Sequence, residues 1–184
     1  MNKAYANRGT HLEQIINKTN IYYVTNNIAY IYKKPTPIVV VNVDYPSRNK
    51  AMITKAYYKI PSTTDYNGLY NGYYIDFEAK ETNNKTAFSL SLIHKHQLEH
   101  LINIDNNKGI AFIIIRFSYY DEIYLLTIKK MIEFIKSYNR KSIQYSWIKQ
   151  HAHLIEESIY PTIDYIKIVN KLIRGYINGR NQSL

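Results

Sequence analysis

The chain contains no cysteine. This absence excludes disulfide bonds, zinc sites built from thiolates and cysteine nucleophiles, and it is consistent with a cytoplasmic protein. The longest apolar run, residues 109–115, is too short to cross a bilayer, and the N-terminus lacks the apolar segment of a secretion signal. Neither a G-x-S-x-G motif nor a glycine-rich loop ending in Lys-Ser or Lys-Thr is present, so the sequence predicts neither a serine hydrolase nor a phosphate-loop protein.

Negative charge is also scarce, since 14 acidic residues face 24 lysines and arginines and the formal net charge is +10. Such a balance favours polyanionic partners, above all nucleic acid, through phosphate neutralisation and counterion release. Part of the lysine excess can reflect an A/T-rich genome, because the chain is crowded with Ile, Asn, Lys and Tyr. A length of 184 residues with 46% hydrophobic residues predicts one ordered domain with a full core.

Hydrophobic periodicity predicts a single α/β domain. Helices are expected at 10–23, 90–102, 128–137 and 163–173, strands at 28–32, 109–117 and 123–127, a hairpin at 62–81, and irregular structure at 138–150. Residues 33–60 are expected to form two strands joined by a basic, polar loop that projects from the body. Residues 1–175 would form the domain, with the stalk insertion at about 36–60 and a flexible tail at 176–184.

The hairpin holds two Asn-Gly pairs, and each of them suits a two-residue type I′ turn. A turn at Asn71-Gly72 gives the longer strands and the cleaner alternation, with an apolar face suited to the core. This register pairs Asp65 with Glu78 and Thr63 with Lys80. Asp76 shares their face, one strand step back, as a candidate support that either tunes the site or pairs with a nearby base. A turn at Asn67-Gly68 would separate Asp65 from Glu78, and a one-residue bulge would change every partner.

Two directly opposed carboxylates repel each other unless a cation neutralises them. Mg²⁺ prefers oxygen ligands and is held by one or two carboxylates together with waters and substrate phosphate. Lys80 would reach the same patch and stabilise charge on a phosphate. The alternative is an exposed hairpin whose charges prevent edge pairing.

The helix expected at 90–102 adds a glutamine and three histidines. Gln97 falls in the apolar stripe, where it is either a satisfied structural amide or a ligand for a metal-bound water or phosphate. His96 and His100 are four residues apart, as in some zinc sites, but the glutamate of H-E-x-x-H is missing and solvated histidines are the better interpretation. Glu13 fits a capping box with Thr10, and as an early-helix acid it is a candidate support for the metal site.

An acidic residue followed thirteen residues later by Glu-Ala-Lys resembles the core of the PD-(D/E)xK nucleases, a pattern that is weak alone. More specific elements run in order along nearly the whole chain and resemble the RecU family of Holliday junction resolvases. These elements are NRG at 7–9, TNIYY at 19–23, KKPTP at 33–37, TTDYNG at 63–68, YIDFEAKET at 74–82, NKT at 84–86, HKHQLEH at 94–100, RKSI at 140–143 and IDYIKI at 163–168. Only six residues precede NRG, where family members often carry a longer basic tail.

The resemblance implies a restriction-endonuclease-like mixed β-sheet flanked by helices, with a β-stalk that enters the junction. It implies a homodimeric endonuclease that uses Mg²⁺, or Mn²⁺ in its place, to nick four-way DNA junctions in pairs during recombination and repair, in contact with recombination proteins. The metal ligands would be Thr63, Asp65, Glu78 and Gln97, with the carbonyl of Ala79 as a further ligand and Lys80 as the transition-state stabiliser. The residues expected to contact DNA are Arg8, Arg48, Lys50 and Lys55. Two alternatives are a non-catalytic factor that binds junctions or anneals strands, and a nuclease that acts on ordinary duplex.

Overall fold

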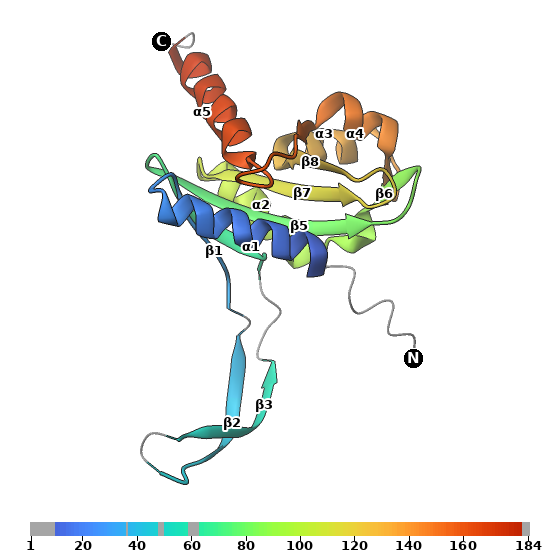
Figure 1. The fold of residues 1–184 in the computed structure, drawn as a ribbon. Helices are drawn as coiled ribbons and strands as arrows, with labels where there is room; N and C mark the ends of the chain where they lie inside the picture. Colours follow the sequence, from blue (N-terminus) through green and yellow to red (C-terminus); the bar gives the residue numbers. More distant parts are fainter. Residues whose placement is uncertain (1–9, 36, 48–49, 59–62, 182–184) are drawn as a thin grey trace.

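A computed structural model describes residues 10–35, 37–47, 50–58 and 63–181, and its centre is a six-stranded mixed β-sheet (Figure 1). The strands follow the spatial order β1 (Tyr30–Lys33), β4 (Tyr66–Tyr70), β5 (Tyr73–Thr82), β7 (Ile110–Phe117), β8 (Glu122–Thr127) and β10 (His153–Ile155). Strands β5 and β7 are parallel, and the other neighbours are antiparallel. The expected class, a mixed sheet flanked by helices, is confirmed.

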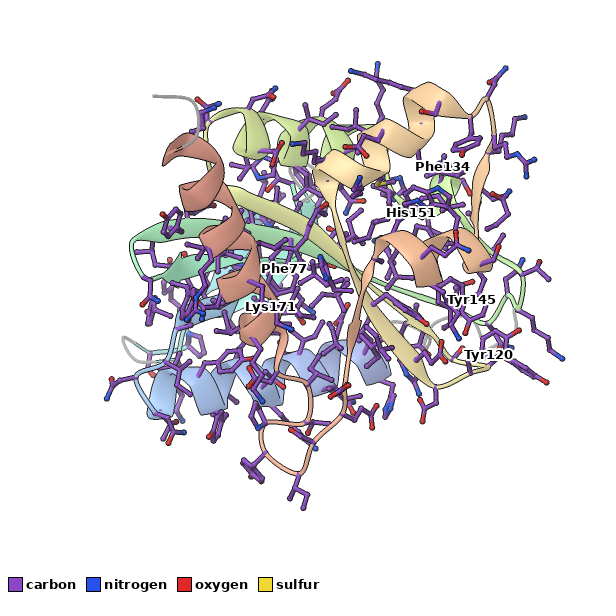
Figure 2. The ribbon with its side chains drawn as sticks, turned by 90° about the horizontal axis from the view of Figure 1, so that it is seen from above. Phe77, Tyr120, Phe134, Tyr145, His151 and Lys171 are labelled. Atoms are coloured by element: carbon purple, nitrogen blue, oxygen red, sulfur yellow. The ribbon has the colours of Figure 1, made fainter. Side chains whose placement is uncertain are left out.

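Helices cover both faces of this sheet. Helices α1 (Thr10–Thr25) and α5 (Tyr165–Asn181) share one buried apolar cluster with β5 and β7, and Tyr66, Phe77 and Phe112 stack at its centre. Helices α2 (Lys95–Asn106), α3 (Ile128–Ser137) and α4 (Tyr145–His151) pack on the other face. Figure 2 shows α1 and α2 on opposite sides of the strands, with Phe77 beside α5 and Phe134 on α3.

Three of the predicted segments are wrong in part. The region 138–150, expected to be irregular, contains β9 (Ser142–Gln144) and α4, because β9 pairs with β6 (Ala87–Ser89) through the buried Phe88 and Ile143. Three-residue strands carry too little periodicity to be recognised in a sequence. The helix expected from residue 90 begins at Lys95, after a 3₁₀ turn, η1 (Leu90–Leu92), and α5 starts at Tyr165 and continues to Asn181.

The strand pair expected within residues 33–60 is confirmed as β2 (Ile38–Asp44) and β3 (Met52–Tyr58). The two strands form a separate antiparallel ribbon with register shifts around Asn42, and they project from the body on the side away from α5 (Figure 1). The described side chains of the ribbon are mostly exposed, including those of Val41, Met52 and Tyr57. We call this ribbon the stalk.

The turn at Asn71-Gly72 is confirmed, and it sets the register of the hairpin. Both residues have positive φ, 48° and 80°, as a type I′ turn requires. The ladder runs from Tyr70↔Tyr73 to Tyr66↔Phe77, as predicted. The competing turn fails because Gly68 lies inside β4, where a Cβ would approach the Tyr30 carbonyl oxygen to 2.1 Å.

Candidate active site on strand β5

The polar face of β5 lies beneath α2. Because β5 and β7 are parallel, the chain must cross the sheet between them, and α2 is the main helix of that crossover. The crossover covers the face that carries Asp76, Glu78 and Lys80, and the side chains of Asp76 and Glu78 have no exposed area. The interpretation of these charges as a solvated edge is therefore excluded.

Glu78 sits beside a second carboxylate and a lysine. The Lys80 ammonium donates to Glu78 Oε1 at 2.6 Å, and the Asp65 backbone N–H donates to Glu78 Oε2 at 3.2 Å. Burial, followed by the charge and hydrogen bond of Asp65, raises the pKa of Glu78 to about 8, although Lys80 acts in the opposite direction. We call Asp65, Glu78 and Lys80 the Glu78 cluster.

The register predicted beyond Tyr66 needs correction, because residues 63–65 bend away from the ladder instead of continuing it. Asp65 still meets Glu78, and its carboxylate accepts a hydrogen bond from the backbone N–H of Ala79 at 3.3 Å. Thr63 does not pair with Lys80, since its hydroxyl accepts from the Lys34 ammonium at 3.1 Å. Within the bend, the buried Thr64 turns its hydroxyl inward and donates to Asp76 on β5.

The direction of helix α2 predicts that Gln97 lies near the level of Glu78. His100 Nε2 lies 3.0 Å from Asp76 Oδ2, and α2 runs opposite to β5. Gln97 is one helical turn before His100, and Glu78 is one strand repeat after Asp76, so both steps lead in the same direction. Gln97 is buried and its Oε1 accepts the His94 backbone N–H at 3.0 Å, so the side chain also caps the helix.

A second group of polar side chains surrounds Asp76. Its carboxylate contacts the Lys34 ammonium at 2.7 Å, the Tyr74 hydroxyl at 3.0 Å and His100 at 3.0 Å, and it accepts a short hydrogen bond from Thr64. We call these five residues the Asp76 cluster. Lys34 and Thr64 lie within the motifs KKPTP and TTDYNG but were not among the predicted site residues. His100 lies within HKHQLEH, and its interpretation as a solvated histidine is wrong.

Other predicted site residues lie apart from the Glu78 cluster or outside the described residues. Glu13 binds the Lys33 ammonium at 2.6 Å, and its charge, after burial and together with those of Asp65 and Glu78, raises the pKa of Tyr66. Lys50 and Lys55 are exposed residues at the loop and on β3 of the stalk. Arg8, Arg48 and the expected cap of α1 lie where the structure describes no side chain.

The histidines do not form a metal centre. His94 and His96 stack on each other with ring centroids 5.5 Å apart, and His100 belongs to the Asp76 cluster. Across the described ranges no group of three or more His, Asp and Glu side chains is arranged to hold a metal, so a cation in the Glu78 cluster would need neutral oxygen ligands as well. In the same part of the chain, no helix is long and apolar enough to cross a membrane.

The fold and the Glu78 cluster together define a mixed α/β protein that carries a glutamate and a lysine on a central strand, with an aspartate from the bend before β4 beside them. The family model described as RecU, recombination protein U, matches residues 7–171. The chain therefore belongs to the RecU family, as the sequence motifs indicated.

Relatives and one solved structure give the extent of the similarity. The chain is 52% identical over 169 residues to the Holliday junction resolvase RecU of Bacillus cereus strain B4264, an alignment that covers 90% of this chain and 84% of the relative. The protein of the same name from Bacillus thuringiensis strain Al Hakam gives the same values. The structure of Hjc, a Holliday junction resolvase from Archaeoglobus fulgidus, matches 80% of this chain and 92% of its own with 10% identity and a TM-score of 0.44.

Proposed function

We propose that this protein is a structure-specific endonuclease that resolves Holliday junctions in DNA recombination and repair. It would hydrolyse phosphodiester bonds in a Mg²⁺-dependent reaction, with Mn²⁺ able to substitute, and introduce paired symmetric nicks. It would act as a homodimer on four-way DNA junctions in the cytoplasm, with recombination proteins as further partners. Membership of the RecU family and the names of the relatives support this proposal.

One observation carries the catalytic part of the proposal, the fully buried Glu78 next to the carboxylate of Asp65. Burial and, after it, the adjacent carboxylate of the half-buried Asp65 disfavour the charged form of Glu78, and its raised pKa expresses both effects. Strongly perturbed groups of this kind concentrate at functional sites.

The donor atoms of the site fit a hard divalent cation. Asp65 and Glu78 supply charged oxygens, Thr63 and Gln97 supply neutral ones, and the Ala79 carbonyl would be a further ligand, which is the oxygen-rich set that Mg²⁺ prefers. Such a cation would neutralise the two carboxylates and so offset the burial and the Asp65 charge that raise the pKa of Glu78. Mg²⁺ bound there supplies the Lewis acidity that favours hydrolysis of a phosphodiester at neutral pH.

Lys80 has a separate role in this proposal. Its side chain is 22% exposed, whereas that of Glu78 is fully buried, so the ammonium lies at the accessible edge of the site. The hydrogen bond to Glu78 holds the ammonium in place before substrate binds. From there Lys80 would stabilise the negative charge that develops on the phosphate oxygens in the transition state.

The stalk and the net charge of +10 suit a substrate read by shape and by its phosphates. Lys50 and Lys55 extend along the exposed stalk, away from the Glu78 cluster, as expected for phosphate contacts together with Arg8 and Arg48. A two-fold symmetric dimer would match the symmetry of a four-way junction and present two sites for paired cuts.

The test compares cleavage of four-way junctions with cleavage of linear duplex, with and without Mg²⁺. We expect the wild-type protein to cut junctions only with metal, and Asp65→Asn to bind junctions with similar affinity without cutting them. If wild type never cuts, the protein is a junction-binding factor; if it cuts duplex equally well, it is a nuclease without junction specificity. An active Asp65→Asn variant would contradict the assignment of the site.

A further inference from the structure

The carboxylate of Asp76 connects four separate segments of the chain. Its partners are Lys34 after β1, Thr64 in the bend 63–65, Tyr74 on β5 itself and His100 on α2. Burial of a carboxylate is unfavourable unless it is paired and hydrogen-bonded, and these contacts supply both conditions. Asp76 is therefore the point at which a loop, a strand and a helix are held together.

Lys34 links Asp76 directly to the bend that carries two of the predicted metal ligands. Its ammonium contacts Asp76 at 2.7 Å, Thr64 Oγ1 at 2.6 Å and Thr63 Oγ1 at 3.1 Å. Its backbone N–H also donates to the carbonyl oxygen of Asp65 at 2.8 Å. The lysine is mostly buried, with 14% of its side chain exposed, so Asp76 is the acid that neutralises this charge at the border of the site.

The contact of Asp76 with His100 links β5 to helix α2. His100 fixes the rotation of α2 over β5, and Gln97 lies one turn earlier on the same helix face. Glu78 is held on β5, two residues after Asp76. Two of the predicted metal ligands, Thr63 and Asp65, thus flank Thr64, which contacts Asp76. Gln97 is one helical turn from His100, which also contacts Asp76, and Glu78 is one strand repeat from Asp76 itself.

We propose that Asp76 is a positioning residue for the metal site. It holds the bend 63–65 and helix α2 against β5, so that the predicted metal ligands converge. It also neutralises the Lys34 ammonium, which would otherwise repel a divalent cation. This inference rests on the proposed function, because it concerns the metal site of that reaction.

Asp76→Asn separates this role from packing, because asparagine has nearly the same shape and retains hydrogen-bonding capacity but lacks the charge. In this variant the Lys34 ammonium stays next to Thr63 without a neutralising carboxylate. Loss of a residue that orients metal ligands weakens metal affinity by about 10–100-fold. Asp76→Asn combined with Lys34→Met removes both charges and is expected to recover part of this loss.

The experiment measures Mn²⁺ affinity by calorimetry on the full metal-free chain in the absence of DNA. We expect Asp76→Asn to bind Mn²⁺ about 10–100-fold more weakly than wild type, the double variant to bind more tightly than Asp76→Asn, and excess Mn²⁺ to restore junction cleavage. If Asp76→Asn does not fold, His100→Gln takes its place and should weaken Mn²⁺ binding in the same direction.

Tyr165→Phe is the matched control for general destabilisation. It removes a buried hydrogen bond between α5 and Asn20 of α1, on the face of the sheet opposite the Asp76 cluster. The thermal midpoint should therefore fall while Mn²⁺ affinity stays at the wild-type value. The inference is overturned if folded Asp76→Asn binds Mn²⁺ as tightly as wild type does. If Asp76→Asn does not fold, it is overturned by a His100→Gln variant that binds Mn²⁺ as tightly as wild type. A double variant that binds Mn²⁺ no more tightly than Asp76→Asn also overturns the inference.

These measurements also separate the inference from the proposed function. A wild-type protein that binds Mn²⁺ but cuts no DNA overturns the proposed function, while the comparison of affinities still decides the role of Asp76. A wild-type protein that binds no Mn²⁺ overturns both.

Discussion

The two buried carboxylates of β5 lie two residues apart on one face, yet their surroundings differ. Asp76 is surrounded by an ammonium group, two hydroxyl groups and an imidazole. Glu78 has one lysine and a second carboxylate as neighbours, and its pKa is raised to about 8. The first carboxylate is satisfied by the fold, whereas the second is left with a conflict that a bound cation would relieve.

This difference separates stability from chemistry within a single strand. A satisfied buried charge holds segments together, and removing it leaves its partners unpaired. A buried carboxylate in conflict with its neighbours is what a metal site requires before the metal binds. Removal of charge from the Asp76 cluster should therefore mainly lower stability, whereas removal of charge from the Glu78 cluster should mainly lower catalysis.

The largest expected effect is on stability. Asp76→Ala should lower the free energy of unfolding by about 3–5 kcal/mol, because it leaves the buried Lys34 ammonium without its carboxylate. Urea denaturation measures this value. Glu99→Ala is the control, because its exposed contact with Lys95 at 3.5 Å should contribute less than about 0.5 kcal/mol. A loss as small as that of the control would show that the Asp76 cluster does not hold the fold together.

The next effect concerns catalysis in the Glu78 cluster. Lys80→Ala should reduce the rate of junction cleavage by about 10²–10³-fold, because the transition state loses a positioned positive charge. Single-turnover kinetics with saturating Mg²⁺ measures the rate, and junction affinity should change little. Lys129→Ala, which removes an exposed lysine from the first turn of α3, should cut at the wild-type rate. Similar losses in both variants would indicate a general charge effect.

A pH titration of stability distinguishes the two carboxylates more finely. Without metal, folded Glu78 keeps its proton up to a pKa of about 8, whereas the unfolded chain releases it near 4.5. The folded state therefore binds more protons between these values, so this group makes the protein less stable as the pH rises through the window.

Denaturation of wild type and Glu78→Gln across that window isolates the contribution. The stability of wild type relative to the variant should fall with pH by up to about 1.4 kcal/mol per pH unit, the value for one full proton. Mg²⁺ should reduce this slope, because it replaces the proton. Parallel curves for the two proteins would contradict the raised pKa.

The smallest effect is expected in the stalk, outside both clusters. Lys55→Ala should weaken junction binding only slightly and lower the slope of log affinity against log salt by about 0.9, the value for one lost phosphate contact. Junction affinity measured over a range of salt concentrations tests this expectation. An unchanged slope would show that Lys55 does not contact phosphate.

Much of the Glu78 cluster could be predicted from local sequence. The Asn71-Gly72 turn and strict alternation predicted the hairpin register from Tyr66 to Tyr73, because a type I′ turn and a two-residue period leave little freedom. The apolar run at 109–117 and the hydrophobic periodicity at 128–137 likewise predicted β7 and α3. These elements depend on neighbours that are close in sequence.

The Asp76 cluster could not be predicted in this way. Its members Lys34 and Asp76 are 42 residues apart, and His100 follows Asp76 by 24 residues on another element. No periodicity relates such positions, and Thr64 leaves the ladder because of a contact that only the folded chain makes. The role of Asp76, left open by the sequence, became visible through these partners.

By itself the sequence determined the family, the mixed α/β class, the turn of the hairpin and the side of β5 on which its charges lie, because motifs, turn chemistry and strand alternation are local properties. The tertiary structure decided that this side is buried and that Asp76 and Glu78 differ. Burial depends on the crossover of α2 between two parallel strands, and the fate of a buried charge depends on which distant groups the fold brings to it.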